Sequence, residues 1–145
     1  MLFKEDAVAR KEAMAVRNDA GWYRWQHDLV EVSGPDAAGF LDFVCVNDIA
    51  GAAQGVSKYT TLLNDDGKII DDVIVTNMGD DVYWVSTLYA PKFAKWFEKK
   101  SGGFECSMRE LTNEIDMYAV QGPKSPDVMN GLLDTPVDGE AEGSR

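Results

Sequence analysis

Three consecutive segments of strand-forming residues, separated by short turns, constrain the fold of this chain more than any other feature. Residues 58–63 and 69–77 flank a turn at 64–67, where Asn and Asp can hydrogen-bond locally and Gly67 can adopt a positive φ. A second turn at 79–81 leads into the third segment, residues 82–88. The pattern predicts a three-stranded antiparallel meander near the middle of the chain.

Helical patterns lie on both sides of the predicted meander. Helices are predicted over residues 3–18, after Ser33-Gly34-Pro35-Asp36 with Ser33 as N-cap, from Pro91 to about residue 100, and from Ser125 to 133. Shorter strands are predicted at 29–32, 104–109 and 117–121. Helices interspersed with antiparallel hairpins indicate an α+β fold, in which helices pack on one face of the sheet.

Composition places the chain among globular proteins. It has 145 residues, of which 45% are hydrophobic, and we expect one ordered region over residues 1–133 followed by an acidic, disordered tail over 134–145. The net charge of -11 disfavours nucleic acid and anionic membrane surfaces as partners. No apolar segment is long enough to span a bilayer and the amino terminus is charged, so we expect a cytoplasmic protein.

Residue types that usually carry catalysis or metal binding are sparse. Cys45 and Cys106 lack the spacing of a zinc site and are expected to be buried thiols, and His27 is the only histidine, so no metal site is predicted. Glycine-rich phosphate loops and a nucleophilic serine motif are absent from the sequence. The aromatic residues Trp22, Tyr23 and Trp25 fit either a stacking platform or buried core residues, and burial is the more common explanation.

Two adjacent carboxylates, Asp71 and Asp72, interrupt an apolar predicted strand. Neighbouring strand residues point to opposite faces, so one carboxylate is expected to face inward wherever the other faces solvent. An inward carboxylate costs free energy unless it is hydrogen-bonded or functional. The pattern by itself leaves two interpretations open: a functional carboxylate, or an edge strand with a solvated charge.

Several blocks of sequence, read in order, resemble one known family. The strongest block is Tyr59-Thr60-Thr61-Leu62-Leu63-Asn64-Asp65-Asp66-Gly67-Lys68-Ile69-Ile70-Asp71-Asp72-Val73-Ile74-Val75. Further blocks are Val30-Glu31-Val32-Ser33-Gly34-Pro35-Asp36-Ala37, Val82-Tyr83-Trp84-Val85-Ser86 and Ala119-Val120-Gln121-Gly122-Pro123. Together they resemble the amino-terminal region of the glycine cleavage T-protein (aminomethyltransferase) family over residues 15–133.

The resemblance implies a one-carbon transferase that uses tetrahydrofolate and a small-molecule one-carbon donor. It implies that Asp72 is the inward, catalytic carboxylate that lies against the folate pterin, and that Tyr59, on the paired strand, lines the folate pocket. It also implies a ligand-contact position at Thr87, where the family has the asparagine of a V-N-A segment.

Departures from the family pattern qualify what the chain does. Family members are two to three times longer, and their Y-T-G-E-x-G-x-E block is absent here. Residues 23–28 keep little of the F-D-[LVM]-S-H-M segment, which favours a demethylase-like branch. The sequence therefore predicts an amino-terminal portion or subunit of a methyl or aminomethyl transferase, completed by a companion chain or by a homo-oligomer. The alternatives are a non-catalytic folate-binding or assembly subunit and an inactive truncated homologue.

Overall fold

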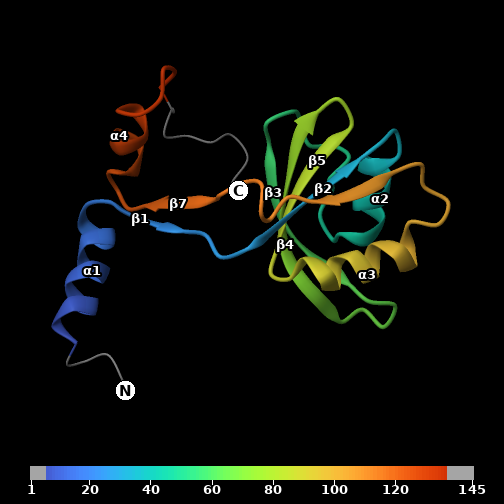
Figure 1. Cartoon of the computed structure of the whole chain (residues 1–145), viewed down its shortest axis with the longest axis horizontal. Helices are drawn as coiled ribbons and strands as arrows, with labels where there is room; N and C mark the ends of the chain where they lie inside the picture. The colour runs from blue at the N-terminus through green and yellow to red at the C-terminus, as the bar shows by residue number, and fades with distance from the viewer. Residues whose placement is uncertain (1–5, 137–145) are drawn as a thin grey trace. The chain divides into compact units, whose positions relative to one another are not determined.

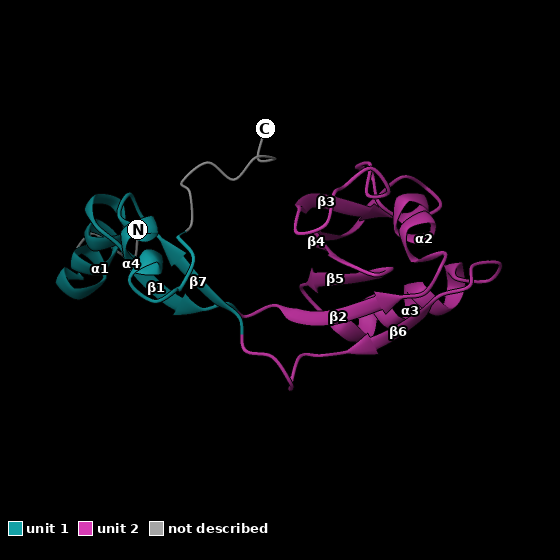
Figure 2. Cartoon of the chain, turned by 90° about the horizontal axis from the view of Figure 1, so that it is seen from above, with its two compact units in different colours: residues 1–25, 117–142 teal, residues 26–116, 143–145 magenta. Residues whose placement is uncertain are grey.

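The computed structural model describes residues 6–136, which form two compact units (Figures 1 and 2). Unit 1 comprises residues 6–25 and 117–136, and unit 2 comprises residues 26–116. Each unit has its own antiparallel sheet: two strands in unit 1 and five strands in unit 2. The predicted tail begins at residue 134, and its residues 137–145 lie outside the described part of the chain.

The sheet of unit 2 has the strand order β3-β4-β5-β2-β6, and all its neighbouring strands are antiparallel. The predicted meander forms three neighbouring strands of this sheet, β3 (Ser57–Leu63), β4 (Ile69–Gly79) and β5 (Val82–Thr87). β2 (Asp28–Ser33) pairs with β5 and with β6 (Ser107–Glu110). The strand segments read from residue patterns are therefore confirmed, with bounds that differ by one to three residues.

The turns of the meander form for the reasons that the sequence indicates. The Asn64 amide donates to the Lys68 carbonyl at 2.9 Å, and Gly67 has φ +74°. Asp80 and Asp81 both have positive φ, at 51° and 58°, the conformation that a tight hairpin turn requires and that Asp tolerates. Both connections therefore return the chain antiparallel, and they set the register of the strands that follow.

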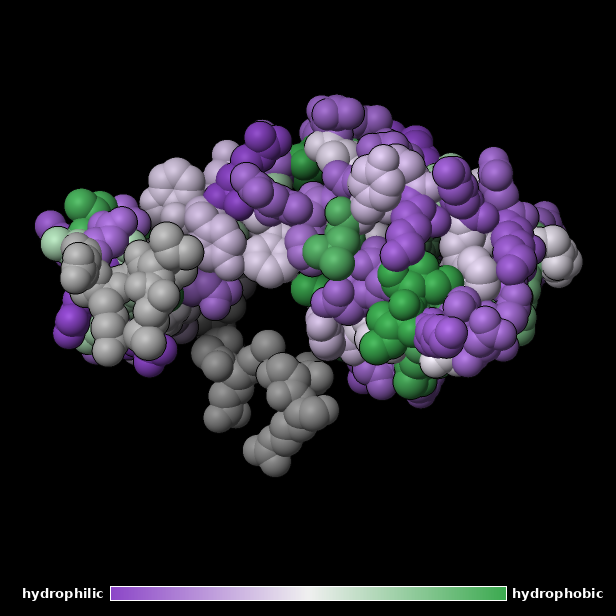
Figure 3. Space-filling view, turned by 90° about the horizontal axis from the view of Figure 1, so that it is seen from below, coloured by the Kyte–Doolittle hydropathy of each residue, from purple (hydrophilic) through white to green (hydrophobic). Residues whose placement is uncertain are grey.

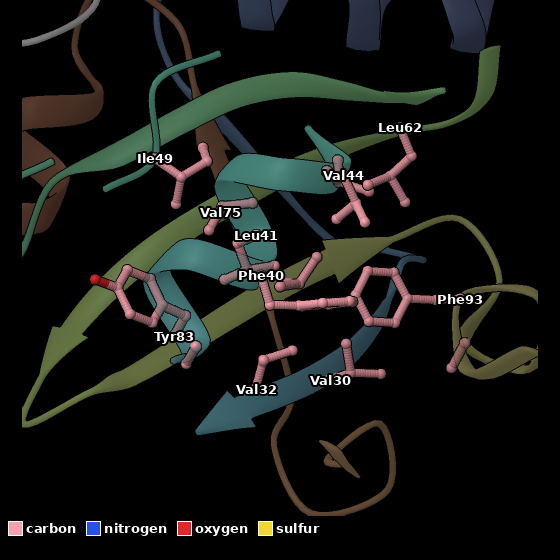
Figure 4. Close-up of a cluster of buried hydrophobic side chains, with 14 residues drawn as sticks. Val30, Val32, Phe40, Leu41, Val44, Ile49, Leu62, Val75, Tyr83 and Phe93 are labelled. Atoms are coloured by element: carbon pink, nitrogen blue, oxygen red, sulfur yellow. The ribbon is translucent and has the colours of Figure 1, made fainter. Parts of the chain in front are cut away.

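The core of unit 2 lies between one face of the sheet and two helices, α2 (Ala37–Val44) and α3 (Ala90–Lys100). Figure 4 shows side chains from both helices meeting those of the strands, with Phe40 of α2 in the middle. Alternate strand residues supply the sheet side of this core, namely Val30, Val32, Leu62, Val73, Val75, Tyr83 and Val85. The predicted α+β architecture with helices on one face of the sheet is confirmed.

Unit 1 consists of α1 (Ala7–Asn18), α4 (Ser125–Asn130) and the pair of β1 (Gly21–Arg24) with β7 (Tyr118–Gln121). The side-chain carboxylate of Asp6 caps α1, accepting from the amides of Val8 and Ala9 at 3.0 Å. No residue of unit 1 between 6 and 25 or between 117 and 136 is buried. Unit 1 therefore has no hydrophobic core of its own among the described residues.

Two local predictions are wrong. Ser33 does not cap α2, because it is the last residue of β2 and Asp36 holds the N-cap position. The Asp36 carboxylate bonds outside the helix, accepting from the Glu105 amide at 2.8 Å. The aromatic cluster is not buried either: Trp22 is 71% exposed, because the two-stranded sheet that carries it has no packed layer over this side chain. Instead, its ring meets Tyr118 edge to face with centroids 5.6 Å apart.

Among residues 6–136, no helix has the length and apolar character needed to cross a bilayer.

Candidate functional site

The two carboxylates of β4 lie on opposite faces of the sheet of unit 2. We call the face away from α2 and α3 the open face; it carries Tyr59, Asp72, Ile74 and Ser86. These side chains share a face because residues alternate along each strand and because the register pairs Tyr59 with Ile74 and Ile74 with Ser86. The register therefore brings three polar side chains from three strands to one face of the sheet, where Tyr59 is exposed, Asp72 is partly exposed and Ser86 is buried.

Tyr59 and Asp72 form the most specific polar contact of the open face. Asp72 pairs with Thr61 on β3, so Tyr59 is its diagonal neighbour, within reach of a long side chain. The Tyr59 hydroxyl donates to Asp72 Oδ2 at 2.6 Å, although the Tyr59 side chain is 63% exposed. The arrangement places a carboxylate acceptor beside an exposed aromatic ring, and this combination can bind a flat ligand that carries N–H donors.

The prediction that Asp72 is the inward carboxylate is wrong. Asp71 is the buried one, at 5% exposure, and it faces the helices, whereas Asp72 is partly exposed on the open face. Asp71 pairs with Leu62 and Asp72 with Thr61, and this register decides which of the two points into the core. A role for Asp72 in ligand binding thus depends on the open face and not on burial within the core.

Thr87, the third predicted site residue, does not join Tyr59 and Asp72. It is fully buried, and its hydroxyl donates to Asp71 Oδ2 on the helix side of the sheet. The neighbouring Ser86 points to the open face instead, where its hydroxyl lies 3.1 Å from His27 Nδ1. Sequence reasoning missed Ser86 and assigned His27 no role in the site. The β4–β5 register, which pairs Ser86 with Ile74, places Ser86 on this face, and the contact with Ser86 brings His27 to it.

The Tyr59–Asp72 contact makes a testable prediction about ionisation. The hydrogen bond to the Asp72 carboxylate raises the pKa of Tyr59 above its usual value of 10.0, and desolvation and the negative charge of Asp72 add smaller increases. We expect the pKa of Tyr59 to fall towards that of an ordinary tyrosine in Asp72→Asn, because the neutral amide replaces the charged acceptor of the Tyr59 hydroxyl and leaves only the effect of desolvation. Carbon-13 NMR of labelled tyrosine rings measures this pKa, and Tyr59→Phe identifies the signal. An unchanged pKa would contradict the contact.

A separate pocket of about 220 Å³ lies where the end of α2, the end of β3 and α3 meet. Its lining includes Phe43, Cys45, Asp65, Trp96 and Lys100. Lys99 and Lys100 pair with Asp65 and hold its pKa down at about 2, and their ammonium groups lie 4.9 and 5.0 Å from the Trp96 ring centroid. Within residues 6–136 no group of three His, Cys, Asp or Glu side chains is placed to bind a metal ion.

Cys45 and Cys106 are both partly buried and pack against the hydrophobic core, so the expected burial of the two thiols is partial. Burial, with the nearby charge of Asp42, nevertheless raises the pKa of the Cys45 thiol to about 12. At pH 8 the thiolate fraction is therefore about a thousand-fold below that of an ordinary thiol, and alkylation is expected to slow accordingly. In Cys106→Ser, Cys45 is the remaining cysteine, and its rate of alkylation by iodoacetamide can be compared between the native chain and the chain unfolded in urea. Equal rates in the two states would contradict the raised pKa of Cys45.

The fold and the open face together define a small sheet-and-helix domain with an acidic and aromatic surface, and comparison with known proteins gives its family. Residues 3–142 match the family model described as the GCVT N-terminal domain. The chain therefore belongs to the aminomethyltransferase family, as its amino-terminal domain.

Individual relatives agree with this assignment. The chain is 34% identical over 133 residues to an aminomethyltransferase of Streptomyces avermitilis, covering 90% of this chain and 36% of that protein. It is 31% identical over 131 residues to an aminomethyltransferase of Staphylococcus haemolyticus, covering 88% and 36%. The crystal structure of glycine cleavage system aminomethyltransferase T from Bartonella henselae matches with a TM-score of 0.75 and 33% identity, over 83% of this chain and 34% of that one. The chain thus spans about a third of the length of these relatives.

Proposed function

We propose that this chain supplies the folate-binding face of a tetrahydrofolate-dependent one-carbon transferase, as its amino-terminal portion or subunit. The observation that carries the proposal is the Tyr59–Asp72 pair on the open face, at two of the positions that the family resemblance assigns to the folate pocket. The family membership supports the reaction class, since the relatives at 31% and 34% identity are named aminomethyltransferases.

The chemistry of the pair suits a reduced pterin. Asp72 offers carboxylate oxygens to ring N–H groups, and Tyr59 offers an exposed aromatic surface beside them. When bound, tetrahydrofolate supplies the nitrogen atoms that accept the one-carbon unit. Asp72 would orient these nitrogens and accept a proton from them, while the hydrogen bond from Tyr59 holds the carboxylate in place. The departures at residues 23–28 favour a methyl donor over an aminomethyl donor.

A titration of the purified chain with tetrahydrofolate tests the proposal. Trp84 pairs across the sheet with Thr76 and shares the open face with Ser86, so its fluorescence is expected to report binding there. We expect saturable quenching of the fluorescence of the wild-type chain. The part of the quenching that comes from Trp84 is expected to be lost in Trp84→Phe. Quenching that persists in Trp84→Phe would place the ligand elsewhere.

Absence of binding at millimolar tetrahydrofolate would contradict a folate site within this chain alone. That outcome favours the second candidate function, an assembly subunit without its own cofactor. The composition of unit 1 supports this second candidate. None of its residues 6–25 and 117–136 is buried, and the side chains of Trp22, Tyr118 and Leu132 are 71%, 54% and 77% exposed.

We further propose that the remaining part of the family's fold covers these apolar surfaces, as a companion chain or as a further segment. Large apolar side chains are exposed on unit 2 as well, among them Phe43, Val46 and Ile69, and Figure 3 shows hydrophobic side chains gathered between hydrophilic ones on this unit. Contiguous exposed apolar surface is typical of an interface. Ligand sites are usually enclosed on most sides, so such a cover would also complete the folate pocket.

A further inference from the structure

Asp71, next to the proposed folate ligand Asp72, accepts hydrogen bonds from groups of this chain on both of its carboxylate oxygens. Its Oδ1 accepts from the Asp72 amide at 2.9 Å. Its Oδ2 accepts from the Thr87 hydroxyl and from the Leu88 amide, the latter at 3.3 Å. With 5% exposure, the carboxylate is out of reach of a ligand on the open face.

These bonds lie where the pairing between β4 and β5 ends. The β4–β5 register begins at Gly79 and stops at Ile74 opposite Ser86, whereas Asp71, Asp72 and Val73 are paired with β3. Beyond that point the backbone N–H groups of the two strands need other acceptors, because a buried N–H without a partner is costly. Asp71 supplies an acceptor to both sides of the opening: to Asp72 on β4, and to Leu88, which follows β5.

A carboxylate is an expensive means of filling a core position. Leu or Val at residue 71 would satisfy the core packing without the cost of removing a charge from water. Neither could bind the Asp72 amide or the Thr87 hydroxyl, however. Such departures from simple core composition are expected at functional sites, where a defined geometry is worth the lost stability.

We propose that Asp71, held by the buried Thr87 hydroxyl, is the positioning residue for Asp72 and fixes the Asp72 backbone so that its side chain meets Tyr59 on the open face. The relevance of this inference to folate rests on the proposed function. The geometry itself concerns only groups of this chain, so it can be tested without a ligand. Thr87 then contributes to the site through Asp71 and not by contact with the cofactor.

The test compares the Tyr59–Asp72 contact in Thr87→Val and Thr87→Ser, using carbon-13 NMR of labelled tyrosine rings in the ligand-free chain. Val keeps the shape of Thr and removes the hydroxyl, whereas Ser keeps the hydroxyl. We expect the pKa of Tyr59 in Thr87→Val to lose most of its elevation and approach the value in Asp72→Asn. Thr87→Ser should retain the wild-type value.

Thr112→Val is the matched control. The Thr112 hydroxyl also accepts a hydrogen bond from a backbone N–H group, that of Leu29, at 3.1 Å, but it forms no hydrogen bond with Asp71. If the role of Thr87 is merely structural, Thr87→Val and Thr112→Val are expected to change the pKa of Tyr59 by the same amount. The proposal is overturned if both change Tyr59 equally, or if Thr87→Val folds and leaves Tyr59 unchanged.

Asp71→Asn provides a second variant should Thr87→Val fail to fold. The amide oxygen of Asn keeps one acceptor while the charge is lost, so we expect a chain that folds with a weakened Tyr59–Asp72 contact. A wild-type Tyr59 signal in folded Asp71→Asn would overturn the proposal. A parallel titration of the wild-type chain with tetrahydrofolate separates the two hypotheses. If the variants lose the elevated pKa of Tyr59 while the wild-type chain binds no tetrahydrofolate, the positioning role of Asp71 is supported and the proposed function is contradicted.

Discussion

Asp72→Asn is expected to weaken tetrahydrofolate binding by about ten- to a hundred-fold, because a hydrogen bond to a charged group contributes about 1.5–3 kcal/mol. Asn keeps the size of Asp and one acceptor oxygen, so the loss of affinity measures the contribution of the negative charge of Asp72. Where the completed enzyme transfers a one-carbon unit, the same change is expected to lower the rate by about 10²–10⁴-fold, the usual contribution of a positioned acid or base. Fluorescence titration and single-turnover transfer measure the two effects.

The matched control for this change is Asp66→Asn, which removes an exposed carboxylate from the β3–β4 turn. It lowers the net negative charge by the same amount, so a general electrostatic effect would appear in both variants. We expect Asp66→Asn to bind as the wild-type chain does. Equal weakening in the two variants would remove Asp72 from the site.

Phe40→Ala is expected to destabilise unit 2 by about 3–5 kcal/mol, the typical cost of truncating a buried aromatic side chain. Phe40 is fully buried and contacts two rings edge to face, Phe97 at 4.9 Å and Phe104 at 5.7 Å between centroids. Small domains are stable by only about 5–15 kcal/mol, so much of the folded population would be lost. Urea unfolding followed by tryptophan fluorescence and circular dichroism measures the difference.

Phe43→Ala tests whether burial accounts for this cost. Phe43 lies on the same helix and also contacts the Phe104 ring, but its side chain is 62% exposed. Its truncation is expected to change the free energy of unfolding by about 1 kcal/mol or less, since little apolar surface leaves water there on folding. Similar losses in the two variants would show that the core is centred elsewhere.

Local residue patterns were sufficient to predict most of the secondary structure of unit 2. The β3–β4 hairpin follows from Asn64 and Gly67, whose preferences act over a few residues and do not need the rest of the fold. The spacing of Phe40, Leu41 and Val44 likewise predicted the buried face of α2. Ser33 shows the limit of such reasoning, since its capping preference was overridden when β2 extended through it to pair with β5 and β6.

The sequence by itself determined the family, the meander and the presence of one inward and one outward carboxylate at residues 71 and 72. Only the tertiary structure decided that Asp71 faces the core and Asp72 the open face. Alternation along a strand allows either assignment, and the cross-strand register with Leu62 and Thr61 selects one. Register likewise placed Ser86 on the open face and Thr87 in the core. Burial of an individual side chain depends on the elements packed above it, and no local pattern within a strand contains that information.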